Sequence, residues 1–181
     1  MALLSTRTRA RAKTRRFTAI ELAIAFALAG SLLAVAVPTF VREVHASRFV
    51  EPVEGLQRIG AAAVAYGRLH PIAQGFPASA PETPALPPRG RCEADPPDLW
   101  EQQPTWAALD FLPAPPGTPH CYAFTFDSTL SPSKSLFRAD AHGDLDGDGI
   151  VSTFEMTGRY VEGDPNGPVL DKGVFVESEV E

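Results

Sequence analysis

The sequence predicts an α+β protein in which a long N-terminal helix packs on a small antiparallel β-sheet. Three observations lead to this prediction. An apolar stretch over 17–37 contains a single ionisable residue, an amphipathic helical pattern follows it, and the last third holds short runs of aromatic and β-branched residues. We divide the chain into a basic leader (1–16), an apolar transmembrane helix (17–38), its amphipathic continuation (39–70), a proline-rich loop region (71–120) and a sheet region with an acidic loop (121–181).

The apolar stretch has the length of a membrane-spanning helix. As a helix, residues 17–37 would rise about 30 Å, which is roughly the hydrocarbon thickness of a bilayer. The leader contains no acidic residue and carries six basic ones, namely Arg7, Arg9, Arg11, Lys13, Arg15 and Arg16. Positive charge at this position holds an N-terminus on the cytoplasmic side. We therefore expect a single-pass membrane protein with an extracytoplasmic C-terminal domain.

Glu21 is the ionisable residue of the apolar stretch. A carboxylate inside a membrane helix is energetically costly, so it is a candidate functional residue. It can pair with a positive charge on a neighbouring subunit, or it can reach the membrane interface from its place one turn into the span. The residues Phe17-Thr18-Ala19-Ile20-Glu21, which follow a basic leader and open an apolar helix, resemble the processing motif of type IV prepilins and type II secretion pseudopilins.

This resemblance implies a role for each residue of the motif. In the family, a prepilin peptidase cleaves just before the Phe and methylates the new amino group, so Arg16 and Phe17 would flank the cleavage and methylation site. Glu21 would pair with the N-terminal amine of an adjacent subunit during assembly. Pro38 lies where many of these helices carry a kinking proline. Arg16 departs from the family pattern, which has Gly before the cut.

The resemblance also implies a place in the cell and a set of partners. The chain would be a structural subunit in a bacterial type IV pilus or type II secretion pseudopilus, and not an enzyme. Its proline content and Arg16 favour a minor subunit. It would lie in the inner membrane or in an extracellular or periplasmic filament. Its partners would be homologous pilin or pseudopilin subunits, the prepilin peptidase and the inner-membrane assembly platform.

A secretory signal peptide is an alternative interpretation of the same N-terminus. The basic start, the apolar core and Ala34-Val35-Ala36 would direct cleavage after Ala36, and Thr14-Arg15-Arg16-Phe17 faintly resembles a twin-arginine signal. Glu21 fits poorly in an apolar signal core, and the helical periodicity continues beyond this cut. The prepilin interpretation is therefore the leading one.

Helical spacing continues after the apolar stretch. Apolar or small residues recur at intervals of three and four, at Val53, Leu56, Ile59, Gly60, Ala63 and Tyr66. This pattern predicts a half-buried amphipathic helix that ends at about Leu69, just before Pro71. Pro38 and Pro52 each lack a backbone donor, so we expect bends near both.

The region 71–120 holds thirteen of the 18 prolines. Such a density excludes long helices and central strands. We expect 71–98 to be a pinned or mobile surface loop. The apolar residues Trp100, Trp106, Leu109, Phe111 and Leu112 predict that 99–113 packs on the domain, with a short helix at 105–110 capped by Thr105.

Four runs in the last third predict strands, at 121–127, 135–141, 153–161 and 174–180. Their short connections favour an antiparallel meander. Cys92 and Cys121 are the two cysteines, and in an extracytoplasmic compartment we expect them to form a disulfide. Two buried thiols are the alternative.

The acidic loop from Asp144 to Glu155 matches the twelve-residue calcium loop of EF-hands. Its expected Ca²⁺ ligands are the side chains of Asp144, Asp146, Asp148, Ser152 and Glu155 and the carbonyl of Ile150. The residues on both sides predict strands rather than the helices of an EF-hand, so we expect a structural calcium site that links two strands. A metal-free hairpin turn is the alternative.

Charge and motif content narrow the function classes. Without the six basic residues of the leader, ten Lys and Arg remain against 22 Asp and Glu, so the rest of the chain carries −12. An acidic exterior of this kind argues against nucleic-acid binding. A membrane-bound hydrolase is disfavoured, because the sequence has no nucleophile elbow and no paired histidines. Besides the filament subunit, one alternative remains: a secreted or membrane-anchored calcium-binding domain that does not assemble.

Overall fold

A computed structural model describes residues 18–96 and 98–177, with no side-chain detail for 41–48. The basic leader, the expected cleavage and methylation site at Arg16 and Phe17, and the end of the fourth expected strand lie outside the described residues. The chain divides into two compact units, residues 1–44 and residues 45–181, and each is described by itself.

The first unit is dominated by one apolar helix. α1 runs from Ala19 to Arg48 and continues through Pro38 without interruption. Its segment Ala19–Phe40 is long and apolar enough to cross a membrane, and none of it is buried among the residues that the structure describes. The N-terminal helix could therefore be a single-pass membrane anchor or a signal sequence. The helix is interrupted at Phe49, which is the N-cap of α2, and not at Pro38.

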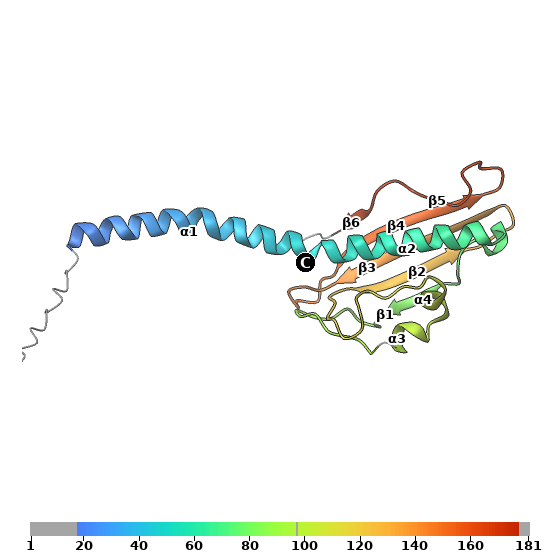
Figure 1. The fold of residues 1–181 in the computed structure, drawn as a ribbon, viewed down its shortest axis with the longest axis horizontal. Helices are drawn as coiled ribbons and strands as arrows, with labels where there is room; N and C mark the ends of the chain where they lie inside the picture. Colours follow the sequence, from blue (N-terminus) through green and yellow to red (C-terminus); the bar gives the residue numbers. More distant parts are fainter. Residues whose placement is uncertain (1–17, 97, 178–181) are drawn as a thin grey trace, which may run out of the picture. The chain divides into compact units, whose positions relative to one another are not determined.

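In the second unit, α2 (Val50–Leu69) covers one face of the sheet (Figure 1). The buried positions Leu56, Ile59 and Ala63 form its inner stripe, as the periodicity predicts, and the helix ends at the expected residue. Gly55 also lies on this stripe, and a Cβ there would lie 2.6 Å from the ring of Phe124. The absence of a side chain thus lets the helix approach the sheet closely.

The sheet is antiparallel and has six strands, in the order β1-β2-β3-β4-β5, with β6 also paired to β4. Their bounds are β1 Ala80–Thr83, β2 Ala123–Thr129, β3 Lys134–Gly143, β4 Ser152–Val161, β5 Val169–Leu170 and β6 Phe175–Glu177. The structure confirms the α+β class and the meander of β2, β3 and β4. The strand expected at 121–127 is shifted by two residues, and β1 and β5 were not predicted.

The proline-rich region is pinned to the domain rather than loose. It contains the 3₁₀ turn Ile72–Gln74, the edge strand β1, and the short helices α3 (Asp98–Glu101) and α4 (Pro104–Ala108). β1 contains Pro81, and its register with β2 is irregular. The aromatic residues of α3 and α4 are buried in the core, as expected.

The prediction that Thr105 caps the short helix is wrong. The N-cap residue is Gln103, and the Thr105 hydroxyl donates a hydrogen bond to the carbonyl of Ala78, 2.6 Å away. Pro104 occupies the first turn, where a missing N–H costs nothing, and this shifts the start of the helix. Thr105 instead ties α4 to the segment before β1.

Candidate functional site

The described chain begins with a reciprocal capping arrangement at the start of α1. The Glu21 carboxylate accepts hydrogen bonds from the backbone N–H of Thr18 at 2.8 Å and from its hydroxyl at 3.1 Å. The Glu21 N–H donates to the Thr18 hydroxyl at 3.3 Å. This is a capping box, which satisfies two of the free donors at a helix N-terminus. Sequence reasoning missed this box, although Thr18 and Glu21 have the Thr-x-x-Glu spacing of its sequence signature.

The remaining polar side chains of the apolar segment are satisfied locally. The hydroxyls of Ser31 and Thr39 donate to the carbonyls of Ala27 and Val35, one turn earlier, at 2.9 Å each. Large side chains such as Ile20 and Phe26 are about three-quarters exposed within the chain. The surface of this segment therefore requires an apolar environment, which a bilayer or neighbouring helices would provide.

The acidic loop connects β3 to β4, and Asp144 is its buried anchor. Only 1% of the Asp144 side chain is exposed. Its carboxylate accepts hydrogen bonds from the N–H groups of Gly147 at 2.8 Å and Gly149 at 3.2 Å. Asp146 and Asp148 are exposed, and each accepts a hydrogen bond from the N–H two residues later. These turns direct the three Asp side chains toward one another.

The three aspartates form a group that could hold a metal ion. One carboxylate oxygen from each of Asp144, Asp146 and Asp148 lies within 4.8 Å of the others. Oxygen donors of this type suit hard divalent cations. Arg89 lies beside the group, with its Nε 3.9 Å from Asp144 Oδ2.

Of the other three expected ligands, Glu155 is not a member of this group of carboxylates. Ile150, whose carbonyl is the expected ligand, directly follows the loop aspartates, and its N–H donates to Asp148 at 2.7 Å. The Ser152 hydroxyl is buried and donates to the carbonyl of Gly143 at 3.1 Å. Glu155 lies in β4 opposite Asp140, with its carboxylate 4.0 Å from Arg138. β4 begins at Ser152, so the chain is extended from there. Three residues of strand place Glu155 about 10 Å beyond Ser152 along the chain.

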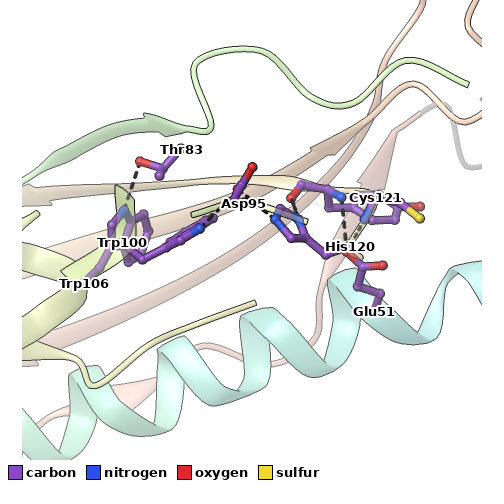
Figure 2. A network of polar contacts seen from close by, with 8 residues as sticks. Glu51, Thr83, Asp95, Trp100, Trp106, His120 and Cys121 are labelled. Atoms are coloured by element: carbon purple, nitrogen blue, oxygen red, sulfur yellow. Dashed lines mark hydrogen bonds and ion pairs between the residues drawn. The ribbon is translucent and has the colours of Figure 1, made fainter. Parts of the chain in front are cut away.

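A second polar cluster joins α2, the residues just before β2, and the loop before α3 (Figure 2). His120 is 3% exposed. Its Nδ1 lies 3.0 Å from the carbonyl of Tyr122, and its Nε2 lies 2.8 Å from Asp95 Oδ2. The indole N–H of Trp100 donates to the same Asp95 oxygen at 3.2 Å. Sequence reasoning missed this cluster, because its members are scattered along the chain with no recognisable spacing.

Glu51 brings α2 into this cluster. Its carboxylate accepts hydrogen bonds from the N–H groups of Cys121 at 2.8 Å and Tyr122 at 3.1 Å. Burial raises the pKa of Glu51 above its ordinary value of 4.5, although these N–H groups and the nearby His120 and Arg58 oppose the rise. Cys121 itself forms the expected disulfide with Cys92.

The raised pKa of Glu51 leads to a stability prediction. The folded protein binds the Glu51 proton more tightly than the unfolded chain, so this contribution to stability is full below pH 4.5 and is lost as pH rises through the folded-state pKa. The stability of the wild type relative to Glu51→Gln should therefore fall as pH rises across this window, measured by urea unfolding. Glu54→Gln, on the exposed face of the same helix, is the matched control. A stability of the wild type relative to Glu51→Gln that rises with pH would contradict the prediction.

Comparison with known proteins found no matching family model, no similar curated protein and no similar solved structure.

Proposed function

We propose that this chain is a structural subunit, of the minor kind, of a type IV pilus or a type II secretion pseudopilus. The observation that carries the proposal is the sequence Phe17-Thr18-Ala19-Ile20-Glu21, placed between a basic leader and the exposed apolar helix α1. Prepilin peptidase would cleave after Arg16 and methylate the amine of Phe17. The mature chain would then assemble through its α1 helix, with Glu21 pairing with the N-terminal amine of a neighbouring subunit.

Two features of the described chain support this proposal. None of the segment Ala19–Phe40 is buried among the described residues, which leaves its circumference for membrane lipid or for other helices. The domain after it lays α2 across an antiparallel sheet, which is the arrangement expected of a pilin-like α+β domain.

The first test is the N-terminal residue and the intact mass of the protein from its native membrane. The proposal requires a chain that begins with N-methylated Phe17. A chain that begins at Val37 would show signal-peptide cleavage and would overturn it. An uncut chain would also count against assembly, because the amine that pairs with Glu21 would not exist.

Replacement of Glu21 by alanine should abolish incorporation into the filament while leaving the protein in the membrane. Removal of one partner of a buried ion pair costs about 3–5 kcal/mol, which corresponds to a loss of incorporation of at least about a hundredfold. The measurement is the ratio of this subunit in sheared filaments to that in membranes. Glu54→Ala removes an exposed carboxylate of α2 and is the matched control. Normal incorporation of Glu21→Ala would favour a non-assembling domain.

We assign Ca²⁺ to the loop of Asp144, Asp146 and Asp148 as a structural ion. Its charge would relieve repulsion between the three carboxylates and fix the connection between β3 and β4. With three carboxylates close together and Glu155 distant, the affinity should be weak, on the order of 0.1–1 mM as in extracellular modules.

Calcium should therefore raise the thermal stability of the domain. At a free concentration of 100 times the Kd, the gain is about 2.7 kcal/mol. Asp146→Asn should weaken this response, because it removes one ligand charge and retains an oxygen acceptor for the turn. Asp164→Asn changes a comparable turn aspartate, which accepts from the Asn166 N–H, and should leave the response intact. Equal melting temperatures with calcium and with chelator would exclude the assignment.

The second candidate function is a secreted or membrane-anchored calcium-binding domain that does not assemble. The presence of Arg16 in place of the Gly of the family motif favours it. Both the acidic loop and the disulfide lie within the second compact unit, so neither requires a filament. The mass measurement and the Glu21→Ala variant separate the two functions.

A further inference from the structure

The segment 89–95, which we call the strap, crosses from the acidic loop to the buried polar cluster. At its start, the Gly90 N–H donates to the carbonyl of Asp144 at 2.8 Å. At its end, Glu93 and His120 exchange two backbone hydrogen bonds of 2.9 Å each. Asp95 then accepts from His120 and Trp100. Between these attachments, the disulfide joins Cys92 of the strap to Cys121.

The two cysteines of the disulfide have different environments. Cys121 is 8% exposed, and its N–H is held by the carboxylate of Glu51. Cys92 is exposed, and so are its neighbours Arg91 and Glu93. An incoming thiolate must approach the sulfur that it attacks, so access favours Cys92.

We propose that Cys92 is a thiol–disulfide exchange site for a dithiol oxidoreductase, and that reduction there loosens the first half of the strap by removing its covalent link to Cys121. This exchange does not depend on filament assembly or on calcium. It assigns to the disulfide a role as a releasable attachment, in addition to its structural role.

The exchange proceeds in two steps. A thiolate of the dithiol attacks Cys92 Sγ, the bond between Cys92 and Cys121 breaks, and Cys121 leaves as a thiolate that takes up a proton. The second thiol of the dithiol then attacks the sulfur of the first, which is bonded to Cys92 Sγ in the mixed disulfide. This breaks the mixed disulfide and releases the Cys92 thiolate, which takes up a proton. The protein gains two electrons and two protons, and the dithiol is oxidised to a disulfide.

The attachments that remain after reduction are unevenly distributed. Residues 89–92 keep the backbone hydrogen bond from Gly90 to Asp144, the 3.9 Å contact of Arg89 with the same residue, and the exposed ion pair of Arg91 with Glu93 at 2.8 Å. Residues 93–95 keep the Glu93–His120 pair and the Asp95 contacts. Reduction should therefore loosen the first half of the strap and leave the second half in place.

The first test measures how fast dithiothreitol reduces the full chain, in detergent, at urea concentrations below the unfolding transition. Exchange in the folded protein predicts a rate that is independent of urea. A rate that rises with urea, with the slope of global unfolding, would show that the disulfide opens only in the unfolded chain and would overturn the proposal.

The second test locates the mixed disulfide. The folded chain is treated briefly with glutathione, quenched in acid, unfolded and alkylated, and the two cysteine peptides are analysed by mass spectrometry. The proposal predicts glutathione on Cys92 and the alkyl group on Cys121. Glutathione predominantly on Cys121, or in equal amounts on both, would overturn it.

Amide hydrogen exchange measures how much residues 89–92 of the strap loosen. In the double variant Cys92→Ser/Cys121→Ser, exchange of the Gly90 amide should rise by about fivefold to tenfold, because its hydrogen bond to Asp144 opens more often once the disulfide no longer restrains the strap. The Glu93 amide is the internal control and should change much less. Equal acceleration at both amides, or at neither, would contradict the selective release of residues 89–92.

Discussion

Replacement of Trp100 by alanine is expected to destabilise the domain by about 3–5 kcal/mol, the range for deletion of a large aromatic core side chain. The indole is 2% exposed and lies 5.6 Å from the ring of Trp106 and 5.8 Å from the ring of Phe111, measured between centroids. The substitution would leave a cavity among these rings, and Asp95 would lose a hydrogen-bond donor. Urea unfolding of the full chain, with and without the substitution, measures the loss.

Two further variants separate packing from hydrogen bonding. Trp100→Phe keeps most of the aromatic surface but removes the donor to Asp95, so its effect should be intermediate. Leu99→Ala changes the adjacent, partly exposed residue of α3 and should cost about 1 kcal/mol or less. A similar loss in Leu99→Ala and Trp100→Ala would show that α3 contributes as a surface element and that Trp100 is not a core anchor.

Gly158→Ala is expected to cost about 2–3 kcal/mol, although it adds a single methyl group. A Cβ at Gly158 would overlap the ring of Phe137 and would lie 3.0 Å from the carbonyl of Val169 in β5. The Phe137 ring cannot move away easily, because it lies 4.8 Å from the ring of Phe76 and 5.3 Å from the ring of Phe126. The overlap must therefore strain either the core or the pairing of β4 with β5.

A double-mutant cycle tests this cause. Phe137→Leu alone should be destabilising, but it creates room for the added methyl group. In the double variant the two losses should be less than additive, with a coupling of about 1–2 kcal/mol. Additive losses would mean that the cost of Gly158→Ala arises from the backbone of the strand rather than from contact with Phe137.

The elements that could be predicted from the sequence are those with a long, regular pattern. The stripe of Leu56, Ile59 and Ala63 identified α2, and alternating residues identified β3 and β4. β1 and β5 were missed for a different reason in each case. Ala80-Pro81-Glu82-Thr83 has few strand-forming residues, and β5 is only two residues long, so each strand exists because a neighbour offers backbone partners.

In the candidate sites too, contacts between residues close in sequence could be predicted, and contacts between residues far apart in sequence could not. The spacing of two residues that brings Asp144, Asp146 and Asp148 together is local, and the turns of the loop enforce it. The place of Glu155 depends on whether helix or strand follows the loop, and the EF-hand pattern presumes a helix. The contacts of His120 with Asp95, and of Glu51 with Cys121, span 25 and 70 residues, so only the folded chain brings them together.

The two borders of the sheet have a consequence for self-association. β1 has four residues, an internal proline and an irregular register, and the opposite border is divided between the short strands β5 and β6. Neither border of the described sheet offers a long, regular row of free N–H and C=O groups on which a strand of another molecule could be added. Amyloid-like stacking of the folded domains is thereby discouraged even when many copies are crowded together. Contacts between copies would then depend on α1 and on side chains, and these contacts can be reversed without unfolding the sheet.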